Sequence, residues 1–349
     1  MIKKITFIFV IIVLMAPSYG WAGFFTRDPV SKALDNYEAD RNIARDQMTV
    51  KVDQGGENEQ PAVSAQGVRS ADGTKKKHKT LETESGVESY AYQYRETVGG
   101  ERFMRLKGVF YGIYLNSTFR PNQLDPFYSD LMNFFRFEIR YAWAHLNYDG
   151  GVQDNAGNHV ADLSLSHVPD SVLETRLLVG KDLSWQGVDF TPYSGLGFRY
   201  LTDDSSDTFG SFTYLGIDYN INGYLRKSYY FYLPFGIDIS KSLAQSWQIG
   251  WNVEYDYFIQ GTQKSYVESE NYSVPTNRQD KGYGMRTSFR LEKTTPNFGF
   301  QIEPFYRFWN IENSEFVQTG PCVPNVGCPG AIEPSNTTHE IGVKLGLTF

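Results

Sequence analysis

Long hydrophobic runs are almost absent from this chain of 349 residues. A membrane-spanning helix needs about 20 consecutive apolar residues, and only the extreme N-terminus approaches that length. The sequence therefore excludes a membrane protein built from several helices. Basic residues are not in excess either, since 33 Lys and Arg stand against 40 Asp and Glu. The net charge of −7 disfavours a dedicated nucleic-acid-binding protein, and we expect no nucleic-acid partner.

Hydrophobic residues make up 41% of the chain, which is below the roughly 45 to 50% of ordinary soluble domains. Aromatic residues are nevertheless abundant, with 24 Tyr and 25 Phe. This combination favours a β-rich chain in which apolar residues alternate with polar ones.

The first 22 residues have the layout of a secretory signal peptide. Lys3 and Lys4 precede an apolar stretch over 5–16, and the segment ends with the small-x-small sequence Gly20-Trp21-Ala22. We predict cleavage after Ala22 and export of the remaining chain. An N-terminal membrane helix that stays attached is the alternative.

Cysteine is scarce, and its two copies permit a single intramolecular pairing. Cys322 and Cys328 lie in a stretch rich in Pro and Gly, and in an oxidising compartment we expect a disulfide between them. The spacing is not that of a CxxC site and no His lies close in sequence, so we predict no metal or cofactor.

Residues 23–86 form a polar leader with few aromatic residues. Asp28-Pro29 is a helix-start signal, and it predicts a helix over about 29–48. The segment 54–84 is too polar to build a core, so we interpret it as a flexible linker. The basic run at 75–79 could contact lipid phosphates or an acidic polymer, although such runs are usually only solvated.

From residue 87 onward apolar and polar residues alternate with a period of two. The clearest example is 247–260, in which Trp and Tyr alternate with Asn, Glu and Asp. A strand places these two sets on opposite faces. The pattern predicts ten strands, with eight to twelve as the range, over 87–98, 102–118, 131–149, 171–185, 188–203, 224–239, 247–264, 281–294, 298–313 and 338–349.

Strand length separates a membrane barrel from a soluble sandwich. A strand of 14 residues is roughly 46 Å long, which at a tilt of about 40° more than spans an apolar band of about 25 Å. Sandwich strands are about half that length. Aromatic residues also gather toward the strand ends, as in the interfacial girdles of membrane barrels.

The last nine residues alternate and end in Phe349. Together with the signal segment and the long alternating strands, this tail resembles that of Gram-negative outer-membrane β-barrel proteins. The resemblance covers residues 87–349 and implies an all-β fold, a transmembrane antiparallel up-and-down barrel. It also implies that Phe349 is part of the signal for the barrel-assembly machinery. The implied partners are outer-membrane lipid and lipopolysaccharide, and the implied location is the outer membrane with 23–86 in the periplasm.

An even number of strands returns the C-terminus to the periplasmic side, where the N-terminus begins. Short connections then fall on the periplasmic side. The long connections 150–170, 204–223, 265–280 and 314–337 then form extracellular loops.

The polar faces of the strands predict a charged barrel interior and an apolar exterior. A ten-stranded barrel is only slightly wider than one that side chains can fill, so the balanced charges favour an ion-pair network over a pore. A pore for a small solute remains the alternative. The predicted interior residues are Arg136, Glu138, Arg140, Glu174, Arg176, Arg199, Arg226, Glu254, Asp256, Arg286, Arg290, Glu292, Glu303, Arg307, Glu340 and Lys344, with Asp182 and Asp238 on the same faces.

Histidine is too scarce to indicate a catalytic site clearly. Among the five, His159 and His167 have Asp162 and Asp170 three residues later, in a predicted outer loop. No GxSxG motif occurs, and the paired-Asp and Asp-His patterns of omptin-like proteases are not evident. We therefore assign no catalytic residue.

The sequence predicts a non-enzymatic barrel, either porin-like with a narrow channel or a structural surface protein. The alternative is a barrel enzyme that acts on lipid A, phospholipid or peptide at the outer rim. His78, His145 and His339 complete the five histidines, and we place the latter two on or near the lipid-facing surface.

Overall fold

The computed structural model describes residues 80–121, 126–153, 159–214, 216–267, 273–322 and 328–349. The predicted signal peptide, the helix over 29–48, the basic run at 75–79 and most of the linker lie outside the described residues. The linker prediction is wrong for its last residues, because Leu81 to Glu84 belong to the first barrel strand. Within the described part of the chain, no helix is long and apolar enough to cross a membrane.

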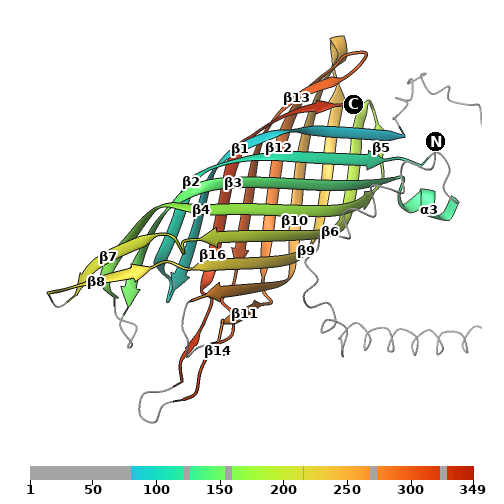
Figure 1. The fold of residues 1–349 in the computed structure, drawn as a ribbon. Helices are drawn as coiled ribbons and strands as arrows, with labels where there is room; N and C mark the ends of the chain where they lie inside the picture. The colour runs from blue at the N-terminus through green and yellow to red at the C-terminus, as the bar shows by residue number, and fades with distance from the viewer. Residues whose placement is uncertain (1–79, 122–125, 154–158, 215, 268–272, 323–327) are drawn as a thin grey trace, which may run out of the picture. The chain divides into compact units, whose positions relative to one another are not determined.

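Ten long strands form a closed antiparallel barrel, and this confirms the predicted fold class (Figure 1). Each barrel strand pairs with the next barrel strand along the chain. The last strand pairs with the first, in a register that places Glu84 opposite Thr348. The barrel strands are β1 (Leu81–Val98), β2 (Glu101–Phe119), β3 (Phe134–Gln153), β4 (His159–Gly180), β6 (Val188–Asp204), β9 (Leu225–Ser242), β10 (Trp247–Tyr266), β12 (Gly282–Thr294), β13 (Gly299–Ile311) and β16 (Ser335–Thr348).

The remaining elements lie at the two ends of the barrel. We call the end that carries the connections β2–β3, β4–β6, β9–β10 and β12–β13 the turn end, and the opposite end the loop end. The turn end carries α3 (Pro126–Leu131), β5 (Leu183–Trp185) and η3 (Ala244–Ser246). The loop end carries the hairpin of β7 (Phe209–Tyr214) and β8 (Ile217–Asn222), the short β11 (Thr276–Gln279), and β14 (Val317–Gln318) paired with β15 (Gly330–Ala331).

The predicted loop 150–170 is wrong for most of its length, because β3 and β4 continue through it as a paired hairpin. Ser166 and His167 together oppose the single residue Asn147, and His167 has a positive φ of 61°. This β-bulge shifts the alternation by one residue, so the strand pattern before it is out of phase with the pattern after it. β1 likewise begins at Leu81 rather than at 87. Residues 82–85 are all polar, so this stretch has no alternation of apolar and polar residues to indicate a strand.

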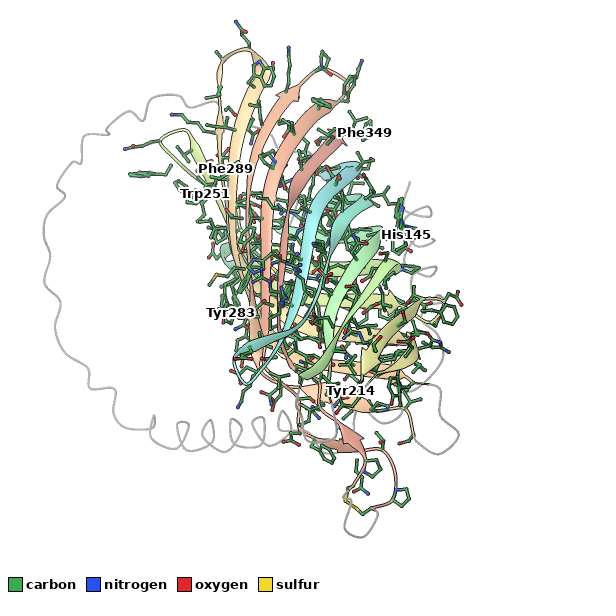
Figure 2. The ribbon with its side chains drawn as sticks, turned by 90° about the vertical axis from the view of Figure 1, so that its left-hand side faces the viewer. His145, Tyr214, Trp251, Tyr283, Phe289 and Phe349 are labelled. Carbon is green, nitrogen blue, oxygen red and sulfur yellow. A yellow bond between two sulfur atoms is a disulfide. The ribbon has the colours of Figure 1, made fainter. Side chains whose placement is uncertain are left out.

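The outer surface of the barrel is apolar. On β10, Trp251, Val253, Tyr255 and Tyr257 are 39 to 53% exposed, whereas the intervening Glu254 is buried. Figure 2 shows Trp251 and Phe289 side by side on this surface, where their rings stack at 5.8 Å. A continuous apolar exterior of this kind is suited to lipid rather than to water. It matches the alternation predicted from the sequence.

Phe349 closes the barrel seam at the turn end. Its backbone N–H donates to the carbonyl of Thr83 at 2.8 Å, and the Thr83 N–H donates back to Phe349. The side chain is 51% exposed on the outer surface. The role of Phe349 in assembly stays a prediction.

Candidate functional site

Ten charged side chains meet at mid-height in the barrel interior. We call this set the charge belt. Its members come from eight of the ten barrel strands, and all are buried or nearly so. The charge belt consists of Glu88, Arg140, Glu174, Arg176, Arg199, Glu254, Asp256, Arg286, Arg307 and Glu340.

Glu340 forms ion pairs with three arginines. Arg199 and Arg307 approach its carboxylate oxygens at 2.6 and 2.9 Å, and Arg140 lies 3.4 Å away. The Glu340 side chain is fully buried. Burial of a carboxylate is costly unless it is paired and hydrogen-bonded, and here the three guanidinium groups supply that compensation.

Glu174 occupies an equivalent position beside it. Arg140 and Arg286 each donate to it at 2.6 Å, and the Tyr232 hydroxyl donates at 2.6 Å. Tyr232 reaches this point by passing over Gly197, which has no side chain. A Cβ at that glycine would come within 2.1 Å of the tyrosine ring. A glycine is therefore required at position 197 for this contact.

Two of the belt's ion pairs join strands on opposite sides of the barrel, whereas others link neighbouring strands, such as Arg140 on β3 with Glu174 on β4. Arg199 is on β6 and Glu340 on β16, which are five strands apart in a barrel of ten. Arg286 on β12 likewise pairs with Glu174 on β4. These bonds cross the interior rather than line its wall. The side chains therefore fill the cross-section at this level.

Aromatic and aliphatic side chains pack against the belt and fill the interior toward the loop end. We call these residues the aromatic plug. Tyr90 stacks on Phe110 at 5.1 Å, and Trp309 meets Tyr232 edge-on at 5.0 Å. Arg199 also lies over the Trp309 ring at 5.6 Å. The aromatic plug comprises Tyr90, Tyr92, Tyr94, Met104, Leu106, Phe110, Ala142, Ala144, Leu146, Val172, Tyr230, Tyr232, Phe258, Trp309 and Ile311. Phe305 packs with the same cluster from the turn side of the belt.

The aromatic plug corrects the expectation that the interior is charged throughout. Tyr90, Tyr92 and Tyr94 of β1 point inward and are at most 7% exposed. Their outward neighbours Ser89 and Ala91 are small, so this strand reverses the rule that large apolar residues face lipid. A narrow interior needs side chains that fill volume, and aromatic rings do this with few polar atoms to satisfy.

The structure places nine of the sixteen predicted interior residues in the charge belt. Toward the turn end, Arg136 pairs with Asp238 at 3.0 Å, and Arg290 and Lys344 both pair with Glu303. Three predicted residues remain. Glu138 pairs with Arg136 and with Arg176. Arg226 lies toward the loop end, and Glu292 lies near Gly299. Asp182, at the turn end, pairs with Arg120.

The sequence pattern did not predict several interior carboxylates, among them Glu88 and Glu96. Glu88 pairs with Arg140 and Arg307, and Glu96 pairs with Arg226 at 2.6 Å. Both lie on β1, and their even spacing from each other was the available signal.

A cavity of about 100 Å³ opens between the charge belt and the turn end. Its lining is mostly charged, including Glu84, Arg136, Glu138, Arg290 and Lys344. A water needs about 10 to 15 Å³ of such space, so several waters fit. The interior therefore has room for water on the turn side of the belt and is packed with side chains on the loop side.

The last loop docks into the loop end of the interior through Glu333. We call its described residues, 312–322 and 328–334, the loop cap. The Tyr94 hydroxyl lies 3.2 Å from the Glu333 carboxylate, and the Gln263 amide donates to the same side chain. The backbone N–H of Glu333 donates to Ser314 at 2.9 Å. Glu333 is 5% exposed although it belongs to a loop.

Burial and the neighbouring Glu96 raise the pKa of Glu333 to about 8. The single hydroxyl hydrogen of Tyr94 cannot serve both Glu96, at 3.0 Å, and Glu333, so a proton on Glu333 completes the second bond. Arg226 faces this group through its pair with Glu96.

The docking of the loop cap is therefore expected to weaken as the pH rises. The unfolded-state pKa of Glu is about 4.3, so Glu333 contributes full stability below that pH and loses it progressively up to about pH 8. Glu333→Gln stays neutral and should remove this dependence. Proteolysis of the loop cap, measured from pH 5 to pH 9, should accelerate in the wild type and stay flat in Glu333→Gln. Equal slopes for the two proteins would contradict this assignment.

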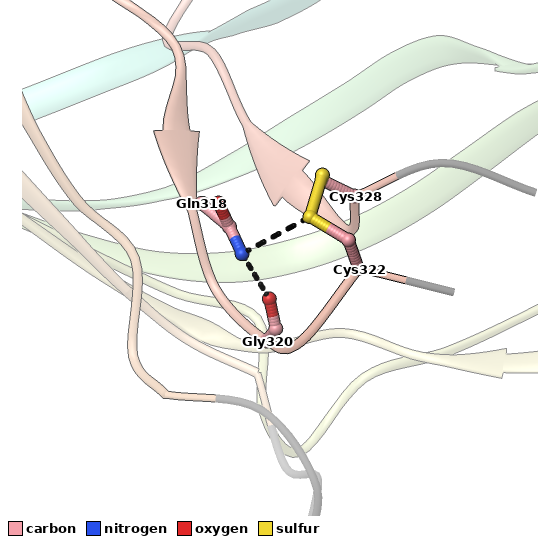
Figure 3. The surroundings of a disulfide bond; sticks show 4 residues. All are labelled: Gln318, Gly320, Cys322 and Cys328. Carbon is pink, nitrogen blue, oxygen red and sulfur yellow. Dashed lines mark hydrogen bonds between the residues drawn. A yellow bond between two sulfur atoms is a disulfide. The ribbon is translucent and has the colours of Figure 1, made fainter. Parts of the chain in front are cut away.

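The predicted disulfide is present within the loop cap, between Cys322 and Cys328. Figure 3 shows it next to Gln318, whose amide donates to the Gly320 carbonyl at 2.6 Å and to Cys322 Sγ at 3.5 Å. The bond joins two residues that are six positions apart in the sequence, so it closes only a short loop.

Removal of the disulfide is therefore expected to act locally. A disulfide that closes so short a loop raises the free energy of the unfolded loop by about 2 kcal/mol, because it reduces its conformational entropy. Cys322→Ser with Cys328→Ser should make the loop cap several-fold more sensitive to protease, with the thermal unfolding temperature of the barrel unchanged. A fall in that temperature would show that the disulfide supports the barrel itself.

Three histidines are described, and the structure places all three at the surface. His145 is exposed on the outer face of β3 (Figure 2), and His167 is exposed in the bulge of β4. His339 bonds to the Tyr306 hydroxyl at 2.8 Å on the outer face. Asp170 instead lines a small interior pocket of about 30 Å³, so the structure does not bring His167 and Asp170 to a common interior site. His78 and the side chain of His159 lie outside the described residues.

No protein-family model and no curated protein matches the chain. Solved structures do match, among them the outer membrane protease OmpT from Escherichia coli. That match is 12% identical, covers 77% of this chain and 96% of that chain, and has a TM-score of 0.51.

Two further matches have lower TM-scores. The translocator domain of the autotransporter NalP from Neisseria meningitidis is 11% identical, with coverages of 78% and 90% and a TM-score of 0.36. The toluene transporter TodX from Pseudomonas putida is 9% identical, with coverages of 78% and 90% and a TM-score of 0.30. At these identities the likeness concerns the fold alone. The chain has the fold of the outer-membrane β-barrel proteins.

Proposed function

We propose that the protein is a closed outer-membrane barrel that presents its loop end at the cell surface. The observation that carries the proposal is the set of ion pairs across the interior, of which Arg199 to Glu340 spans five strands. A solute path would need these buried pairs to separate, and breaking a buried pair costs about 3 to 5 kcal/mol. The aromatic plug and the loop cap add two further barriers on the same side. We therefore favour a structural surface protein over a channel.

The strands that extend toward the loop end supply the presented surface. Leu163 and Leu165 of β4 pack with Val168, Tyr148 and Ile221, so the β3–β4 and β7–β8 hairpins form one small apolar cluster of their own. Tyr214 lies near the tip of the β7–β8 hairpin (Figure 2). Such rigid hairpins are suited to contacts with other surfaces, because little ordering is lost on binding.

Swelling of proteoliposomes in small sugars tests the closed interior. Vesicles that contain the refolded protein should swell no faster than empty vesicles, whereas a general porin included as a control should accelerate swelling. Swelling above the empty-vesicle rate would favour the channel alternative.

The proposed function involves no reaction. Phospholipid, lipid A or peptide turnover by the refolded protein that disappears in His167→Ala would overturn it in favour of a barrel enzyme.

A further inference from the structure

A small pocket of about 30 Å³ lies in the barrel interior toward the loop end, and we call it the loop-end pocket. Two residues of its wall, Tyr94 and Gln263, are those that bond to Glu333 of the loop cap. The pocket therefore lies next to the point at which the loop cap docks. A water needs about 10 to 15 Å³ of such space, so the pocket has room for a group of two or three heavy atoms.

One carboxylate in the wall of the loop-end pocket has no partner. Asp170 lines the pocket, and its carboxyl group is almost completely surrounded by protein. The Oδ1 atom of Asp170 is buried and accepts no hydrogen bond, and within the described part of the chain Asp170 forms no ion pair. A buried carboxylate is costly unless a positive group or hydrogen-bond donors compensate it. The pocket therefore lacks a donor group beside Asp170.

The neighbours of Asp170 add negative charge rather than remove it. In the strand register Asp170 on β4 stands directly opposite Asp203 on β6, and directly opposed like charges destabilise an antiparallel pair. Arg226 also lines the pocket, but it pairs with Asp203 at 2.5 Å and with Glu96 at 2.6 Å. Three carboxylates thus share one guanidinium group, and Asp170 is the one that it does not reach.

The rest of the wall suits a small organic cation. Tyr92, Ser228 and Tyr230 contribute hydroxyl groups, whose oxygen atoms can accept hydrogen bonds, and Leu106 and Leu201 contribute apolar surface. A primary ammonium group has three N–H donors and is about as large as a water molecule. Calcium, in contrast, takes six to eight oxygen ligands, and within the described part of the chain no three His, Cys, Asp or Glu side chains are placed to hold a metal ion.

We propose that the loop-end pocket binds the primary ammonium end of a linear aliphatic amine. The ammonium group donates hydrogen bonds to Oδ1 of Asp170 and to a hydroxyl oxygen of the wall, and its charge compensates the opposed pair of Asp170 and Asp203. The first methylene groups of the amine then contact Leu106 and Leu201. The inference goes beyond the proposed function, because a closed surface barrel needs no ligand in this pocket.

The test compares two variants of the mature chain, refolded in detergent micelles. Asp170→Asn removes the charge of the unpartnered carboxylate and keeps its size. Asp207→Asn is the matched control, since Asp207 is exposed in the connection between β6 and β7 and does not line the pocket. The probes are n-butylammonium and tetramethylammonium chloride. Isothermal titration calorimetry measures binding, and thermal unfolding with and without the amine gives a second reading.

The wild type and the control variant should bind n-butylammonium equally, and Asp170→Asn should bind it about 30-fold more weakly or worse, because a buried charge pair loses one partner. Tetramethylammonium has the same charge but no N–H donor, so it should not bind measurably. The amine should raise the unfolding temperature of the wild type and not that of Asp170→Asn. Without the amine, Asp170→Asn should unfold at or above the wild-type temperature, because the charge opposite Asp203 is gone.

Four results would each overturn the proposal. The first is the absence of both binding heat and thermal stabilisation when n-butylammonium is added to the wild type. The second is equal affinity of the wild type and Asp170→Asn for this amine. The third is equal affinity of the wild type for the two ammonium ions. The fourth is complete displacement of the amine by millimolar calcium, which would make a divalent cation the ligand. None of these results bears on whether the interior is closed, so the inference and the proposed function can fail separately.

Discussion

Glu340→Ala is expected to lower the free energy of unfolding by about 3 to 5 kcal/mol. Removal of one partner from a buried ionic cluster leaves the opposite charges uncompensated, and here three arginines converge on the missing carboxylate. Arg199 is affected most, because Glu340 is its only ion-pair partner within the described part of the chain. Chemical denaturation of the refolded protein in lipid vesicles measures the change.

Glu312→Ala is the matched control for this experiment. Glu312 pairs with Lys281 at 4.0 Å, and the two side chains are 59% and 70% exposed. Exposed pairs contribute about 0 to 1 kcal/mol, so this variant should unfold like the wild type. If Glu340→Ala and Glu312→Ala have the same small effect, the charge belt does not hold the barrel interior together.

Trp309→Ala is expected to lower the free energy of unfolding by about 3 to 5 kcal/mol through the loss of packing in the interior. Trp309 is 1% exposed in the aromatic plug, and its truncation leaves a cavity between Tyr232 and Arg199 that the barrel wall cannot collapse to fill. Because Tyr232 also donates to Glu174, the loss extends into the charge belt. Denaturation in vesicles again gives the magnitude.

The comparison variant is Trp251→Ala, which removes the same side chain from the outer face. Trp251 is 45% exposed and stacks on Phe289. Lipid can take the place of the missing ring, so the cost should be less than half of that for Trp309→Ala. A larger effect at Trp251 than at Trp309 would contradict the assignment of inner and outer faces.

The barrel could be predicted because the alternation on strands such as β10 is unambiguous. There, Trp and Tyr at outward positions alternate with Glu254 and Asp256 at inward positions, and a period of two leaves no other arrangement. The closing tail up to Phe349 is equally clear. The β3–β4 extension could not be found in the same way, because the bulge at Ser166 and His167 changes the phase of the pattern.

The interior could be predicted only in part, since residue type does not fix which way a tyrosine points. Tyr90 in the plug and Tyr255 on the outer face look alike in sequence, and only the register of β1 against β2 and β16 separates them. The ion-pair partners across the barrel could not be predicted from the sequence either. The pairing of Arg199 with Glu340 depends on closure and stagger of the ten strands, which no local pattern encodes.

Conductance of the refolded protein in planar lipid bilayers tests the closed interior most directly. The ion pairs that span the barrel, the aromatic plug and the docked loop cap together predict no stepwise current above background, at any voltage and in dilute or molar salt. Reproducible unitary current steps from the wild-type protein would contradict the account, because they require an open path through the charge belt.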